Sequence, residues 1–186
     1  YASRGLGDVY KRQREWLYDG AGSNTWGNIA MWTHAIRHYK ENLQWSDEIN
    51  LRSLEKARRK HHLQTVAAMN LKKTPGGANT NKVELREFVK KHKGLLRSQV
   101  DLYWSQTDII VCCGVEVGSL FRSLVKDISL QKHVFETADK EMAKKILYYQ
   151  TGDGKLIIDF YHPQAHISKG FMYNSIRDIV SLFYKS

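Results

Sequence analysis

The chain has 186 residues, of which 42% are hydrophobic and 26% are charged, a composition that fits one globular domain and argues against an intrinsically disordered protein. Lys and Arg exceed Asp and Glu by 29 to 19, and this excess favours a polyanionic partner, although some domains are basic for solubility alone. No apolar run is long enough to cross a bilayer and no signal peptide opens the chain, so we expect a cytoplasmic protein with no membrane partner.

The first thirteen residues, Tyr1 to Gln13, contain no initiator Met and no clear amphipathic period. They resemble a translated sequencing adaptor. We therefore expect residues 1–13 to be a non-native segment that has replaced the natural N-terminus, and residues 14–186 to form a single domain.

In the first half of the chain, apolar residues recur at helical spacing from Thr25 to about Tyr39, which predicts an amphipathic helix. A second helix is predicted over residues 48–61. The short apolar run from Leu63 to Met69 is partly β-branched and predicts a strand that is buried on both faces and ends at Asn70.

In the second half, Asn81 and Glu84 form a capping signature at the start of a long predicted helix that reaches about residue 104. A second buried strand is predicted at 108–113 and is followed by a helix to about 125. A helix near 137–145 then leads into a hairpin of residues 146–149 and 156–160 around a glycine turn. Ser168 opens the final helix.

Strands that alternate with long helices predict an α/β protein, a three-layer α/β/α fold with a mainly parallel central sheet. In such sheets, ligands bind beyond the carboxyl ends of the strands. These ends carry Asn70, Gly114 and the segment Tyr161-His162-Pro163. The two cysteines, Cys112 and Cys113, are adjacent in an apolar run, so we expect buried thiols and no metal site.

Three segments occur in a characteristic order: Asn70 before a basic loop that contains proline, the strand Asp108-Ile-Ile-Val-Cys-Cys-Gly114, and Tyr161-His162-Pro163. This order resembles the uracil-DNA glycosylase superfamily, whose thermophile-type branch has Asn-Val-Val-Lys-Cys-Arg-Pro, Ile-Val-Ala-Leu-Gly and Tyr-His-Pro-Ser segments. The similarity covers about residues 24–186. It implies a uracil-DNA glycosylase-like fold and a DNA glycosylase that hydrolyses the N-glycosidic bond of uracil or a related altered base, without a cofactor.

The resemblance also implies roles for three side chains. Asn70 would read the Watson–Crick edge of the flipped base, because a carboxamide can accept from uracil N3–H and donate to O4. His162 would stabilise the negative charge of the departing base, and Trp26 would stack on the base. The structural alternatives are an Asn that caps its own turn, a loop histidine and a core tryptophan.

Further residues match the DNA-contacting segments of the family. In the loop after His-Pro, Ile167 would fill the vacated base stack, and Ser168 with the following helix N-terminus would hold a phosphate. Gln164 stands where the family has Ser, which changes the contacts of this loop. Lys72 and Lys73 would contact the DNA backbone, although they are equally plausible as solvent-exposed lysines.

Two features of the family have no counterpart in the sequence. Residues 1–23 contain no match to the segment that positions the attacking water, and two cysteines cannot hold the iron–sulfur cluster of the thermophile-type branch. Two alternatives to the enzyme therefore stay open: a catalytically inactive nucleobase- or DNA-binding module of the same fold, and an α/β domain whose basic surface meets RNA or an acidic protein. Single- or double-stranded DNA is the expected partner, and we expect a monomer.

Overall fold

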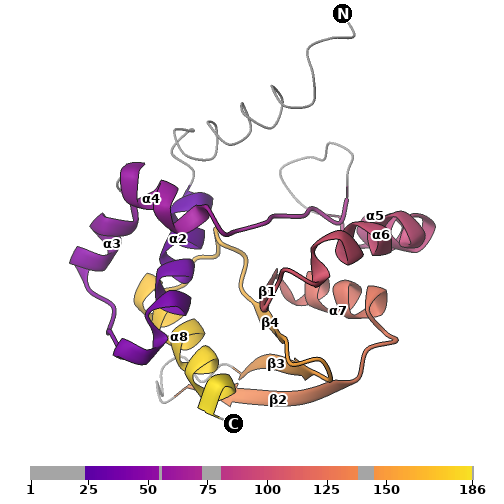
Figure 1. Ribbon diagram of the computed structural model, residues 1–186. Coiled ribbons are helices and arrows are strands. Elements are labelled where there is room, and N and C mark those ends of the chain that lie inside the picture. The colour runs from indigo at the N-terminus through magenta and orange to yellow at the C-terminus, as the bar shows by residue number, and fades with distance from the viewer. Residues whose placement is uncertain (1–23, 55, 73–80, 138–144, 186) are drawn as a thin grey trace, which may run out of the picture. The chain divides into compact units, whose positions relative to one another are not determined.

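A computed structural model of the chain describes residues 24–54, 56–72, 81–137 and 145–185 (Figure 1). These residues belong to two compact units, one formed by the chain up to Val66 together with the chain from Pro163, and the other by Ala67–His162. We call them the helical unit and the sheet unit. The predicted non-native segment at 1–13 lies outside the described residues.

The helical unit is built from both ends of the described chain. Its elements are α2 (Asn24–Arg37), the short 3-10 helix η1 (Tyr39–Glu41), α3 (Asp47–Leu54), α4 (Lys56–Leu63) and α8 (Lys169–Lys185). Helix α2 packs against α3, α4 and α8. The predicted first and last helices are confirmed, and the helix predicted at 48–61 corresponds to α3 and α4, on either side of residue 55, which lies outside the described residues.

The core of the helical unit lies where α2 and α8 face each other. Helix α8 buries nine of its seventeen residues, at the spacing of an amphipathic helix. Facing it, α2 contributes side chains that are almost completely inaccessible, among them Met31, Trp32 and Ala35. No helix in the described part of the chain combines the length and the apolarity that crossing a membrane requires.

The strand predicted at 63–69 is wrong. Leu63 is the last residue of α4, where its side chain is buried, and residues 66–70 have no regular structure. Ala67 and Ala68 are exposed, so this apolar segment lacks the burial on both faces that would favour a strand. Asn70 consequently does not follow a strand.

The sheet unit contains four strands and three helices among its described residues: α5 (Lys82–Lys91), α6 (Lys93–Trp104), β1 (Ile109–Cys113), α7 (Val115–Leu124), β2 (Leu130–Glu136), β3 (Lys145–Thr151) and β4 (Leu156–Phe160). The strand order is β1-β4-β3-β2. Strand β1 is parallel to β4, and β3 is antiparallel to both of its neighbours. The α/β class, the strand at 109–113 and the β3–β4 hairpin are confirmed.

The sheet also departs from the prediction in its strand directions. Only one of the three pairings in the described sheet is parallel, so the described part is a mixed sheet and not a mainly parallel one. Strand β2 was not predicted. Its polar residues occupy adjacent as well as alternate positions, so the sequence lacks the regular alternation of apolar and polar residues that indicates a strand. The helix predicted at 137–145 falls largely outside the described residues, and Lys145 begins β3.

One face of the sheet is covered by α5, α6 and α7. Helix α7 packs against β1 and β4, and it also contacts α5 and α6. The long helix predicted from Asn81 is two helices, which join at His92 (φ −108°, ψ 22°). The predicted cap is confirmed, because Asn81 Oδ1 accepts from the backbone N–H groups of Val83 at 3.0 Å and Glu84 at 3.3 Å.

Candidate functional site

The parallel strands β1 and β4 end side by side at one edge of the sheet. Cys113 is opposite Phe160 in the register, and the next residue, Gly114, donates its N–H to Phe160 O at 2.8 Å. Tyr161 and His162 continue the chain beyond β4. Gly114, Tyr161 and His162 thus form what we call the carboxyl edge, the position at which α/β sheets bind ligands.

Gly114 makes a sharp turn from β1 into α7 possible. Its φ is 121° and its ψ is 143°, a conformation that residues with a side chain rarely adopt. Helix α7 therefore begins directly at the carboxyl edge, where the N–H groups of its first turn have no partners within the helix. Val115, the first residue of α7, is 78% exposed, so this turn is open to solvent.

The acidic residue in the first turn of α7 is held in an ion pair. The Glu116 carboxylate accepts from Arg86 Nε at 2.5 Å and from Arg86 Nη2 at 3.0 Å, and this hydrogen-bonded guanidinium lowers the Glu116 pKa. The pair joins α5 to the start of α7. Glu116 is therefore ionised but already bound in a bidentate pair.

His162 is exposed at the carboxyl edge. The preceding Tyr161 is partly buried, and burial raises the pKa of its phenol. The phenol therefore keeps its proton at neutral pH and is a possible hydrogen-bond donor.

Asn70 lies in the irregular segment of the sheet unit, and its side chain is exposed. The apolar residues on either side anchor this segment, since Leu71 is buried in the core and Met69 packs against it. Lys72 donates to Glu84 Oε2 at 2.8 Å, which lowers the Glu84 pKa. The segment is thus held at the start of α5, while Lys73 lies outside the described residues.

Trp26 belongs to the helical unit and is partly buried in the first turn of α2. Two residues later, Asn28 is buried, and its Nδ2 donates to Pro163 O at 2.5 Å. This bond ties the start of α2 to the residue that follows His162 in the chain. Asn28 was not predicted from the sequence, although a carboxamide on the apolar side of a helix is the signal that marks it.

Residues 164–168 lead into α8, also in the helical unit. Gln164 and Ser168 are exposed and Ile167 is partly buried. Ser168 Oγ accepts from Phe171 N at 3.3 Å, and Ser168 O accepts from Met172 N at 3.1 Å. Ser168 therefore caps α8, as its predicted place at the start of the helix requires; this role uses the same hydroxyl that would hold a phosphate.

A buried ion pair that the sequence did not reveal lies just before the carboxyl edge. Asp159, the last but one residue of β4, is 8% exposed and pairs with Arg122 of α7. Burial raises the Asp159 pKa, and the Arg122 guanidinium opposes that shift. Arg122 also lies over the Tyr149 ring at 4.3 Å. An acidic residue in the otherwise apolar strand Leu-Ile-Ile-Asp-Phe was the available signal.

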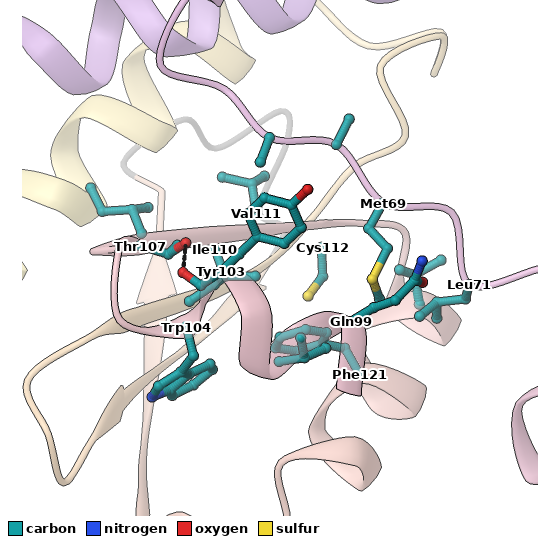
Figure 2. Close-up of a pocket in the computed structure, with 15 residues that line it drawn as sticks. Met69, Leu71, Gln99, Tyr103, Trp104, Thr107, Ile110, Val111, Cys112 and Phe121 are labelled. Carbon is teal, nitrogen blue, oxygen red and sulfur yellow. Dashed lines mark hydrogen bonds between the residues drawn. The ribbon is translucent and has the colours of Figure 1, made fainter. Parts of the chain in front are cut away.

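A cavity of about 180 Å³ lies within the sheet unit (Figure 2). Its lining comes from the irregular segment at 67–71, from α6, from β1 and from α7. Asn70 and His162 are not among the lining residues. The cavity is therefore distinct from the predicted base-binding residues.

The structure gives no sign of a metal centre in its described part, where no group of three or more His, Cys, Asp or Glu side chains has a suitable arrangement. Cys112 is buried and Cys113 is partly buried, and both are free. Burial raises the pKa of both thiols, that of Cys113 to about 11. The thiols therefore stay protonated at neutral pH and act as small apolar groups.

No protein-family model, curated protein or solved structure matches this chain. The resemblance carried by the three sequence segments therefore stays a prediction. The function has to be argued from the chemistry of the residues at the carboxyl edge.

Proposed function

We propose that the chain is a uracil-DNA glycosylase-like protein that binds a flipped uracil or related altered base in DNA and hydrolyses its N-glycosidic bond. The observation that carries the proposal is the position of His162, which is exposed two residues beyond the end of β4, at the edge of the sheet where the parallel β1 also ends. That is the position where α/β sheets present catalytic and binding groups.

His162 suits the difficult step of the reaction. As the glycosidic bond breaks, negative charge collects on the departing base, and a donor that already points at the base oxygen is most favourable in the transition state. A histidine nitrogen can donate such a hydrogen bond without becoming a nucleophile. No cofactor is required for this step.

Two further side chains support recognition of the base. Asn70 is exposed on a segment that its apolar neighbours hold in place, so its carboxamide would be well positioned to read a pyrimidine edge. Trp26 would supply an aromatic face for stacking.

The net charge of +10 supports DNA as the partner. The proposal places Lys72, Lys73, Gln164, Ile167 and Ser168 against the DNA, in the cytoplasm, with the protein as a monomer. It also implies the three-layer α/β/α arrangement of the family, with the described mixed sheet as part of the central layer.

The deciding experiment incubates the chain with a DNA strand that carries one deoxyuridine and measures abasic sites after alkaline cleavage. We expect cleavage at the uracil position, and His162→Ala should lower the rate by about 100-fold or more. His61→Ala is the matched control, since His61 is an exposed histidine of α4 outside the residues proposed to contact the base or the DNA, and it should leave the rate within about twofold. Equal losses in the two variants would contradict the role of His162.

A non-catalytic nucleobase-binding module is favoured by one specific observation. The carboxylates next to the carboxyl edge, Glu116 and Asp159, are both engaged by arginines, so neither is an obvious base to activate water. This alternative predicts salt-dependent binding of uracil-containing DNA with no base release, and binding that His162→Ala weakens. The measurement is fluorescence anisotropy over a salt series beside the cleavage assay.

A further inference from the structure

The cavity of the sheet unit has the size of a small ring. At about 180 Å³ it exceeds the roughly 150 Å³ that is sufficient for benzene in an apolar protein cavity. It is smaller than the 300 Å³ or more that drug-sized ligands occupy. Its volume therefore selects a molecule of one ring with few substituents.

The lining of the cavity is mostly apolar and partly aromatic. Figure 2 shows Met69, Tyr103, Ile110 and Phe121 directed around the same space, contributed by four different segments of the sheet unit. Cys112 adds a thiol that burial keeps protonated. Such a surface favours a flat and largely apolar molecule, through burial of its faces and contacts with aromatic rings.

The polar side chains of the lining are not equivalent. Trp104 Nε1 donates to Asp153 Oδ2 at 2.7 Å, and the Thr107 hydroxyl donates to Tyr103 O at 2.8 Å (Figure 2). Both of these groups already have partners. Gln99 differs, because its Oε1 is buried with no hydrogen-bond partner among the described residues.

A buried acceptor without a donor is unfavourable by about 1–3 kcal/mol. One ordered water would be a poor remedy, since a buried water needs two to four polar partners and the Trp104 indole and the Thr107 hydroxyl already have partners. A ligand that brings an N–H or O–H group on the edge of its ring would satisfy Oε1 and fill the apolar space at the same time.

We propose that this cavity is a binding site for a planar molecule of one ring that donates an N–H or O–H hydrogen bond to Gln99 Oε1. Its faces lie against Met69, Ile110 and Phe121. The inference is independent of the proposed function, because neither Asn70 nor His162 lines the cavity.

Phenol and toluene are the probes that test it, since they have the same size and differ in a hydroxyl against a methyl group. Titration of the ¹⁵N-labelled chain, followed by NMR, gives the affinity and locates the shifts. We expect saturable shifts of the lining residues, with phenol bound about tenfold more tightly than toluene. Gln99→Met should remove this preference by weakening phenol about tenfold while toluene still binds.

Two variants make the result decisive. Gln131→Met is the matched control, because Gln131 is exposed on β2 and outside the lining, and it should leave both affinities unchanged. Ala68→Phe adds a ring to the lining from an exposed position, so it should abolish binding of both probes in a chain that keeps its fold. The absence of saturable shifts at the cavity, or an equal affinity for the two probes in both the wild type and Gln99→Met, would overturn the proposal.

Discussion

The two units differ in how they keep polar side chains in their interiors. In the sheet unit, Asp159 and Arg122 are paired as opposite charges next to the core. In the helical unit, His34 and Tyr173 share a hydrogen bond of 2.9 Å between Nδ1 and the phenol oxygen, and the His62 ring lies 5.1 Å from that of His34. The first arrangement is an ion pair, and the second is a hydrogen bond between two aromatic side chains.

The histidine group of the helical unit consists of His34, His38, His61 and His62. His62 is buried, and its Nδ1 has no partner within the described residues. Burial is the main cause that lowers the His62 pKa to about 4, and His34, His61, Arg37 and His38 lower it further. His62 is therefore neutral at pH 7.

Removal of one partner of the buried ion pair should have the largest effect. Arg122→Ala leaves the Asp159 carboxylate buried without a counter-charge, and we expect the free energy of unfolding to fall by about 3–5 kcal/mol. Arg86→Ala is the control, because the Arg86–Glu116 pair is more exposed and its loss should lower stability much less. Urea unfolding measures both; similar losses would show that burial of the pair is unimportant.

The second effect concerns the glycine that faces the ion pair. A Cβ on Gly118 would overlap the Asp159 carboxylate, so Gly118→Ala should displace that group and lower stability by about 1–3 kcal/mol. Gly94→Ala tests the opposite case within a helix, because no atom lies within 4 Å of the added Cβ. It should raise stability by about 0.5–1 kcal/mol. If thermal unfolding shows that Gly118→Ala and Gly94→Ala change stability in the same direction, the close approach of Gly118 to the Asp159 carboxylate is contradicted.

Acid should weaken the chain through His62. The folded pKa of His62 is about 4 and its ordinary value is 6.5, so between these values the unfolded state binds more protons. The contribution of neutral His62 to the free energy of unfolding is fully present above pH 6.5. As the pH decreases from 6.5 to 4, the free energy of unfolding falls by roughly 1–3 kcal/mol. His62→Phe should flatten this dependence, whereas His166→Gln, at an exposed histidine, should retain it. Urea unfolding at several pH values within the window distinguishes the two.

The smallest effect is expected at the neutral hydrogen bond of the helical unit. Tyr173→Phe removes the hydroxyl that pairs with His34 and should lower stability by about 1 kcal/mol. Tyr184→Phe, at a half-exposed position on the same helix, should change it by less than about 0.5 kcal/mol. If denaturant unfolding gives equal values for both, the buried hydrogen bond contributes nothing measurable.

Local signals explain which elements the sequence predicted. Periodicity of apolar residues marks α2 and α8, and the Asn81 cap is visible in four consecutive residues. In the segment that starts at Asn81, apolar residues keep their helical spacing across His92. The sequence therefore predicted one helix, although α5 ends and α6 begins there. The segment after Leu63 has an apolar composition, but its exposure depends on tertiary contacts that composition does not reveal.

The residues of the candidate site also divide into those with a local signal in the sequence and those whose arrangement depends on tertiary contacts. His162 lies just beyond the end of β4, as the sequence predicted, whereas Asn70 does not follow a strand. The pairing of Asp159 with Arg122 could not be predicted, since the two residues are 37 positions apart and meet only because α7 packs against β4. The open acceptor of Gln99 likewise depends on packing alone.

The arrangement of the helical unit has a consequence for the order of folding during synthesis. The whole of Ala67–His162 leaves the ribosome before α8 does, yet α8 supplies the surface on which α2 packs. Residues 139 positions apart, His34 and Tyr173, must meet. The sheet unit can therefore form first, while α2 keeps an uncovered apolar stripe that is a target for chaperones until the last helix has been translated.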